Sequence, residues 1–238
     1  KIIRTGTRAK KSSAGYDLTK LFVGSEGTLG VITEITLRLH GQPEAISAAV
    51  CAFSDTESAV NSVITAVQMG IPMARIEYLD AASIDAINQY SKLDMKLAPH
   101  LFMEFHGSET GVAEQAEQMA EIVEDFGGAD FQWTTNPEER TKLWHARHTA
   151  YFALKASKPG CLGMSTDVCV PISQLAKAIN DTAEDIAASD LDGTVVGHVG
   201  DGNYHVLFLM EPNNQAQLET ANQLSHRMNM RALDLNGT

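Results

Sequence analysis

Cysteine is scarce in this sequence: its 238 residues include only Cys51, Cys161 and Cys169. These are too few and too scattered for a disulfide framework or a CxxC metal site. We therefore expect reduced, mostly buried thiols and a reducing compartment. Neither Cys161 nor Cys169 has an evident base beside it, which argues against a thiol nucleophile.

Long apolar runs and excess positive charge are also missing. No run of about 18 apolar residues is present that could cross a bilayer, and the opening KIIRTGTRAKK lacks the apolar stretch of a signal peptide. Lysine and arginine total 18 against 30 acidic residues, which gives a formal net charge of −12. Because no basic cluster offsets this acidic background, nucleic acid and anionic membrane surfaces are disfavoured as partners.

What the sequence does contain, after residue 42, is a regular alternation of short apolar segments with longer helical ones. It predicts strands at about 46–53, 74–78, 101–106, near 131, 163–170 and, as a hairpin, 194–210. It predicts helices at about 55–69, 80–90, 109–126, 137–155, 173–188 and 214–235. This order favours an α+β fold, with helices on one face of a sheet.

Residues 1–42 have a different character. A glycine-punctuated segment leads into the β-branched run Val31–Leu39, which predicts a strand preceded by a loop. The sequence GQPE at residues 41–44 then breaks the pattern, and we predict a domain hinge there.

The stretch GHVGDGNYH, residues 197–205, sets two histidines around a glycine-rich turn. A two-residue turn at Asp201–Gly202 would pair His198 directly with His205 and place Asn203 on the same face. Two neutral imidazoles so placed can chelate a divalent ion, with a third ligand from elsewhere. The alternative is a hairpin whose histidines hydrogen-bond only each other or solvent.

A second cluster lies in LWHARHTAYFALK. On one helix, Trp144, Arg147, His148 and Tyr151 would share a face. A guanidinium there could clamp a carboxylate in bidentate fashion. The alternative is a surface ion pair between Arg147 and Glu139 or a nearby acid, with the tryptophan simply in the core.

These motifs occur together in a known family. GYDLTKLFVGSEGTLGVITEITLRLH, STDVCVPIS and GHVGDGNYH follow one another along the chain. With them the sequence resembles the FAD-linked D-2-hydroxy acid dehydrogenases, flavoproteins of the vanillyl-alcohol-oxidase type. It is most similar to their cytochrome-type D-lactate dehydrogenase branch.

The resemblance implies an FAD-binding domain followed by a substrate domain with a ferredoxin-like antiparallel sheet. Residues 1–42 are then expected to be the C-terminal part of the FAD-binding domain, and residues 43–238 the C-terminal substrate domain, truncated before its last motif. The glycine-rich loop would let its backbone approach the cofactor closely, although by itself it equally fits an ordinary turn before a strand. The residues implied to contact FAD are Gly24, Ser25, Glu26, Gly27, Thr28, Leu29, Gly30, Val31 and Ile32.

The implied reaction is oxidation of a D-2-hydroxy acid, D-lactate to pyruvate, with FAD accepting the hydride. Arg147 would hold the substrate carboxylate, and Asn203 would assist the substrate or orient a ligand. His198 and His205 would hold a divalent metal, zinc or manganese, that grips the 2-hydroxyl. Relatives with dicarboxylic substrates add a lysine where this sequence has Ser165, which favours lactate over 2-hydroxyglutarate.

The resemblance also implies that the general base and the third metal ligand come from beyond residue 238, so the chain by itself is not expected to turn over substrate. The expected partners are a small 2-hydroxy acid and an electron acceptor such as a cytochrome or quinone; a homo-oligomer is left open. The expected location is cytoplasmic or peripheral on the inner membrane in a bacterium, or mitochondrial in a eukaryote. The alternative function is a non-catalytic metal-binding or assembly subunit of a glycolate oxidase-like complex.

Overall fold

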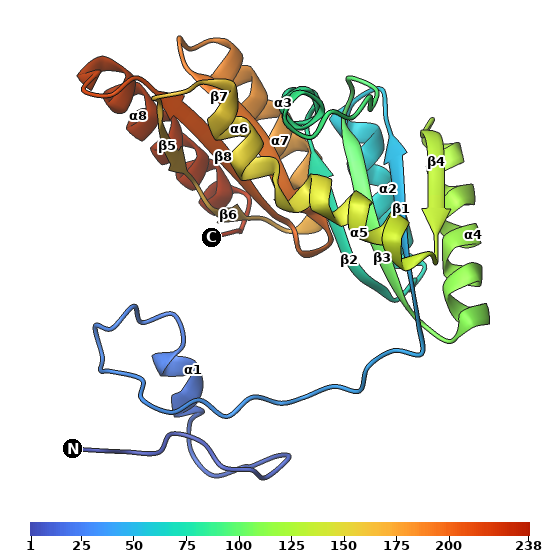
Figure 1. Cartoon of the computed structure of the whole chain (residues 1–238). Helices are drawn as coiled ribbons and strands as arrows, with labels where there is room; N and C mark the ends of the chain where they lie inside the picture. The colour runs from blue at the N-terminus through green and yellow to red at the C-terminus, as the bar shows by residue number, and fades with distance from the viewer. The chain divides into compact units, whose positions relative to one another are not determined.

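The computed structural model describes residues 1–238, which form two units, Lys1–Gln42 and Pro43–Thr238. The first unit holds one short helix, α1 (Leu18–Phe22), whose N-terminus is capped by the Asp17 side chain. All other helices and strands belong to the second unit (Figure 1). None of the helices combines the length and the apolar character that a bilayer crossing requires.

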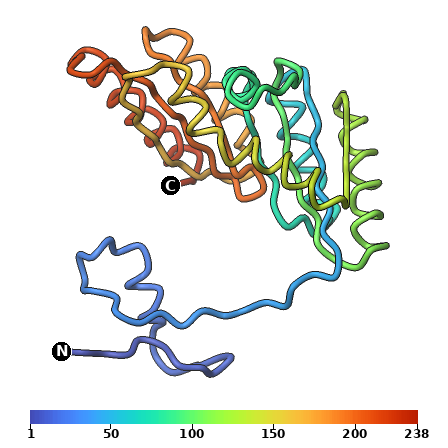
Figure 2. Tube along the Cα trace, viewed as in Figure 1, coloured from blue at the N-terminus to red at the C-terminus, as the bar shows by residue number.

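The strand predicted over Val31–Leu39 is wrong. This segment is an extended trace without secondary structure (Figure 2). A strand's N–H and C=O groups need a neighbouring strand, and the first unit contains no strand to supply one. Its apolar side chains therefore stay exposed: Val31 by 88% and Leu39 by 87%.

The second unit is built on a single sheet in which every pair of neighbouring strands is antiparallel. The strand order is β4-β1-β3-β2-β7-β8-β5, and β6 also pairs with β8. The strands are β1 (Ala45–Ala52), β2 (Met73–Leu79), β3 (His100–Gly107), β4 (Ala129–Thr134), β5 (Leu162–Ser165), β6 (Val168–Cys169), β7 (Asp192–His198) and β8 (Asn203–Met210).

The first four strands have the ferredoxin-like order, with β1 and β3 at the centre and β4 and β2 outside them. A helix follows β1 and another follows β3, so each crossover returns to the same face. The hairpin β7–β8 extends this sheet at its β2 edge. The predicted α+β class with an antiparallel sheet is confirmed.

Helices pack on both faces of the sheet. The main core joins one face to α2, α4, α7 and α8, and a smaller core joins the other face to α3, α5 and α6 (Figure 1). Helices on a single face were predicted; the second layer forms because the strands are apolar on both sides, as with the buried neighbours Leu101 and Phe102. The helices are α2 (Thr56–Gln68), α3 (Ala81–Ser91), α4 (Glu109–Asp125), α5 (Pro137–His148), α6 (Ala150–Ser157), α7 (Ile172–Ala187) and α8 (Gln215–Asp234).

The single helix predicted over 137–155 is divided into α5 and α6 at Thr149. The Thr149 hydroxyl donates to the His145 carbonyl at 2.8 Å, a local hydrogen bond that bends helices. The strand predicted over 163–170 is likewise divided, into β5 and β6. Both pieces pair with β8 in one register, so the interruption at Thr166 is local.

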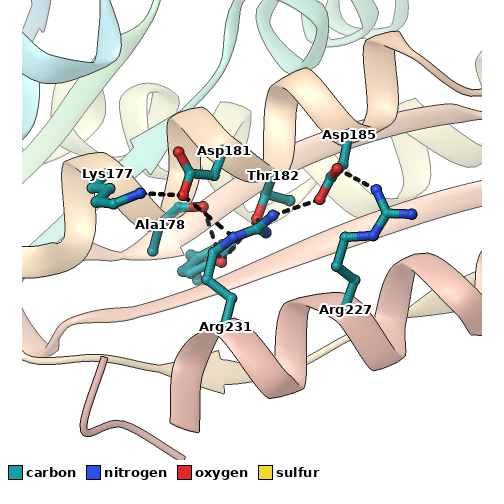
Figure 3. A network of polar contacts seen from close by, with 8 residues as sticks. Lys177, Ala178, Asp181, Thr182, Asp185, Arg227 and Arg231 are labelled. Carbon is teal, nitrogen blue, oxygen red and sulfur yellow. Dashed lines mark hydrogen bonds and ion pairs between the residues drawn. The ribbon is translucent and has the colours of Figure 1, made fainter. Parts of the chain in front are cut away.

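A polar network between α7 and α8 supports β8 from behind (Figure 3). Arg231 donates to Asp185 at 2.5 Å and to the Thr182 hydroxyl at 2.9 Å. The Thr182 hydroxyl lies 3.0 Å from the buried hydroxyl of Tyr204. Because Tyr204 is the residue between Asn203 and His205 in the chain, this network fixes the strand that carries the candidate site.

We expect Arg231→Met to lower the free energy of unfolding by about 2 kcal/mol, because it leaves the largely buried Asp185 with one partner fewer. Burial alone would raise the pKa of Asp185, but hydrogen bonds from Arg231 and Arg227 lower it below its ordinary 3.8. The stabilisation is therefore complete above pH 3.8 and is lost as the pH falls through the lower, folded-state pKa.

Urea denaturation at pH 6 and at pH 3 measures both effects. The matched control is Arg227→Met, which removes the more exposed partner of the same carboxylate and should cost less than about 1 kcal/mol. Equal losses for the two variants at pH 6 would contradict the assignment of the larger contribution to Arg231.

Candidate functional site

The turn between β7 and β8 is not the predicted two-residue turn at Asp201–Gly202. The chain instead makes a 3-10 turn, Val199–Asp201, and then Gly202 in the left-handed region at φ 78°. A Cβ atom on Gly202 would lie 2.1 Å from the carbonyl oxygen of Val170, so only glycine fits. The burial of Val199 and the close approach of Gly202 to Val170 favour this four-residue connection, 199–202, over a two-residue turn.

The wider turn changes the pairing of the histidines. His198 pairs with Asn203, and His205 pairs with Val196, so the predicted direct pairing of His198 with His205 is wrong. Paired residues and residues two apart share a face of the sheet, so both histidines and Asn203 still lie on one face. The imidazole centroids are 5.3 Å apart, with the rings nearly perpendicular. The histidines are diagonal neighbours.

The Nδ1 atom of His198 lies 2.8 Å from the carboxylate of Glu77 on β2. A carboxylate only accepts hydrogen bonds, so Nδ1 carries the proton in this pair. In the neutral imidazole, Nε2 then has a free lone pair. The side chain of His198 is 46% exposed, which leaves room for a ligand.

His205 has the same kind of support. Its Nδ1 lies 3.1 Å from the carbonyl oxygen of Thr166 and 3.2 Å from the carboxylate of Asp167. The N–H of Val206 donates to the hydroxyl of Thr166 at 2.9 Å instead of to the Thr166 carbonyl. The carbonyl oxygen of Thr166 is therefore available to His205. The break between β5 and β6 therefore orients a candidate ligand.

Asn203 is held by its amide nitrogen. That nitrogen donates to Asp167 at 2.7 Å and to the carbonyl of Val168 at 3.0 Å. The amide oxygen is the atom left for a ligand. Asp167 thus orients two side chains of the site.

Arg147 reaches the same place from α5. Its Nη2 donates to Glu77 at 2.8 Å, and the Arg147 side chain is 15% exposed. The alternative surface ion pair does not form with Glu139, which accepts from the hydroxyl of Thr134. The acid that pairs with Arg147 is Glu77, and this pair is mostly buried. Glu77 therefore connects the candidate carboxylate clamp to His198.

The rest of the predicted helix face plays other parts. Trp144 is buried, and the guanidinium of Arg75 lies 3.6 Å above its ring. His148 stacks on Trp144 with a centroid distance of 5.9 Å. Tyr151 belongs to α6 and is about half exposed. The alternative reading of Trp144 as a core residue is the one that its burial favours.

Glu77 was not predicted as a site residue. It is a buried acid in the strand MARIEYL, where Ile76 and Tyr78 face the main core. Its partners lie 70 and 121 residues away along the chain, so no local spacing reveals them. The available signal was a charged side chain inside an otherwise apolar strand end.

The glycine-rich loop lies in the first unit. Gly24 and Gly27 have φ angles of 80° and 78°, and Thr28 donates its N–H to the carbonyl of Ser25 at 2.9 Å. Nothing lies within 4 Å of where a Cβ on either glycine would stand. A flat group could therefore approach this backbone without obstruction. Val31 and Ile32 follow with exposed side chains.

The donor set of the second unit can be compared with what a metal needs. No group of three or more histidine, cysteine or acidic side chains in the chain could together hold a metal ion. His198 and His205 offer two nitrogens, while the carboxylate of Glu77 is used by His198 and Arg147. Catalytic zinc sites have three protein ligands. His198 and His205 supply two of these three ligands.

The fold and sequence have clear counterparts. The chain is 47% identical over 233 residues to a protein named probable D-lactate dehydrogenase, mitochondrial, of Danio rerio, covering 98% of this chain and 47% of the relative. It is 42% identical over 237 residues to D-lactate dehydrogenase [cytochrome], mitochondrial, of Arabidopsis thaliana, covering 100% and 42%. The chain thus spans less than half the length of either relative.

Among solved structures, 4-ethylphenol oxidase from Gulosibacter chungangensis shares the fold with a TM-score of 0.65 at 12% identity, over 84% of this chain and 46% of the other. The family described as FAD linked oxidases, C-terminal domain, matches residues 42–238. The resemblance to flavin-linked D-2-hydroxy acid dehydrogenases is confirmed. This chain belongs to the FAD-linked oxidase family and contains its C-terminal domain.

Proposed function

We propose that this chain forms the substrate-binding part of an FAD-dependent D-2-hydroxy acid dehydrogenase that oxidises D-lactate to pyruvate. The observation that carries the proposal is that Arg147 and His198 share one buried carboxylate, that of Glu77, while the ring of His205 lies 5.3 Å from that of His198. The names of the two relatives support D-lactate as the substrate. We propose that residues 1–42 are the end of the FAD-binding domain and residues 43–238 the substrate domain.

Arg147 binds the carboxylate of the substrate. Its Nη2 is held by Glu77, which leaves the rest of the guanidinium fork for two parallel hydrogen bonds. The side chain is mostly buried, so its charge acts in a medium of low dielectric. Ser165 in place of a second cation favours a small monocarboxylate.

His198 and His205 would hold a divalent metal, zinc or manganese, through their Nε2 atoms. Such a metal, when bound, polarises the 2-hydroxyl of the substrate. Asn203 presents its amide oxygen beside them and assists the substrate or orients a ligand. The third ligand and the general base come from the part of the intact protein outside these 238 residues.

Bound FAD would supply the hydride acceptor for oxidation at C2 of the substrate. Residues 24–32 contact it with backbone groups that the two left-handed glycines leave unobstructed. A cytochrome or quinone accepts the electrons afterwards. In a eukaryote the intact protein is mitochondrial, as the names of the relatives favour.

The test is the flavin absorbance of the intact protein under anaerobic conditions. D-lactate should bleach the oxidised flavin completely, whereas L-lactate should not, and glycolate and D-2-hydroxyglutarate should act more weakly. A stoichiometric flavin that none of the four acids reduces would contradict the proposal. It would favour the non-catalytic assembly subunit instead.

A further inference from the structure

Glu77 is a carboxylate in a buried position. It is 8% exposed, on β2, between Ile76 and Tyr78. A buried charge is costly unless it is paired and hydrogen-bonded. Tyr78 pairs with Gly197 across the β2–β7 ladder. The next opposed residues in this antiparallel register are Glu77 and His198, whose side chains lie on the same face of the sheet. The fold itself brings the carboxylate to the histidine.

Both polar contacts of Glu77 go to residues of the proposed site. Its carboxylate accepts from Nη2 of Arg147 and from Nδ1 of His198, each at 2.8 Å. The first contact fixes the position of the guanidinium. The second sets the tautomer of the imidazole and so chooses Nε2 as the ligand atom.

Glu77 differs in this from the support of His205. The Nδ1 of His205 faces the backbone carbonyl of Thr166 as well as the carboxylate of Asp167, so no single side-chain substitution removes all of its support. Glu77 is a side chain, and it serves two elements that are distant in sequence, α5 and β7. One substitution there would loosen both.

We propose that Glu77 is a positioning residue that holds His198 as an Nε2 metal ligand and Arg147 as the carboxylate clamp at the same time. This inference rests on the proposed function. The inference goes beyond the proposed function because it makes metal binding and substrate binding depend on one carboxylate that contacts neither the metal nor the substrate.

The test is Glu77→Gln in the intact protein. Glutamine keeps the shape but offers a single acceptor oxygen, and its NH₂ group faces one of the two donors. Mn²⁺ titrated into chelator-treated protein should bind about 10- to 100-fold more weakly than to wild type. The KM for D-lactate should rise as well, and the flavin content should be unchanged.

The chain offers a close control in Glu104. It is also 8% exposed, and its carboxylate accepts from an arginine, Arg75, at 2.8 Å and lies 2.9 Å from a histidine, His106. It makes no contact with Arg147 or His198. Glu104→Gln should therefore cost similar stability, measured as the change in Tm, while Mn²⁺ affinity and KM stay within about twofold of wild type.

Measurements on the wild-type protein distinguish a failure of the proposed function from a failure of the positioning role of Glu77. If wild type binds no Mn²⁺ or its flavin is not reduced by D-lactate, the proposed function fails and the role of Glu77 fails with it. If wild type does both and Glu77→Gln matches it in Mn²⁺ affinity and KM, only the positioning role is overturned. Equal losses in the two glutamine variants would also overturn it, because the effect would then be general destabilisation.

Discussion

Replacing either His198 or His205 by alanine is expected to remove most of the divalent metal from the intact protein. Each imidazole presents Nε2, because a fixed acceptor occupies its Nδ1. Loss of an outer hydrogen-bond partner of a metal ligand typically costs about 10- to 100-fold in affinity, and loss of the ligand itself should cost more. The double variant should lose little beyond either single one, because ligands of one ion act as a unit.

Elemental analysis of the purified wild type and of the three variants measures this as moles of metal per mole of protein. His106→Ala is the matched control: His106 also lies 2.9 Å from a buried glutamate on the same sheet but is not at the proposed site. It should retain the wild-type metal content. Equal metal in wild type and in all three hairpin variants would mean that the hairpin binds none.

The elements that were predicted well are those whose signals are local. Asp55 accepts from the N–H of Ser58 and caps α2, and Asp80 caps α3 in the same way. Short apolar runs in β1 and β3 form the centre of the sheet. Side chains within a turn or two of each other decide these features, so the sequence pattern is enough.

The turn at residues 199–202 was predicted wrongly because its shape is decided by distant residues. A Cβ on Gly200 would lie 2.7 Å from Ile76, and one on Gly202 would lie 2.1 Å from Val170. Turn rules consider only the residues of the turn and its two strands. They could not include packing against β2 or against the segment after β6.

The same limit applies to the candidate site. His198, His205 and Arg147 were predicted from short spacings and from the resemblance, and the structure brings Arg147 to His198 only through Glu77. The exposed run from Val31 is the converse case, since its composition fits a strand but the described chain supplies no neighbour for it. Pairing across the fold cannot be predicted from composition.

Arg147→Lys is expected to lower kcat/KM for D-lactate in the intact protein by about 30- to 150-fold, or about 2–3 kcal/mol. Lysine keeps the charge, and its ammonium group can still pair with Glu77. It is a point charge, so it cannot hold Glu77 and also present a planar pair of donors to the substrate carboxylate. Steady-state kinetics and the flavin reduction rate measure the loss.

Arg75→Lys tests whether the effect belongs to this guanidinium. Arg75 has a similar environment on the same sheet, with a 2.8 Å hydrogen bond to Glu104 and a stacked tryptophan, but it lies outside the proposed site. It should lose stability through the weaker cation–π contact and keep kcat/KM within about twofold. If Arg147→Lys also keeps its kcat/KM while losing stability, then Arg147 does not bind the carboxylate, and its hydrogen bond to Glu77 is its whole role.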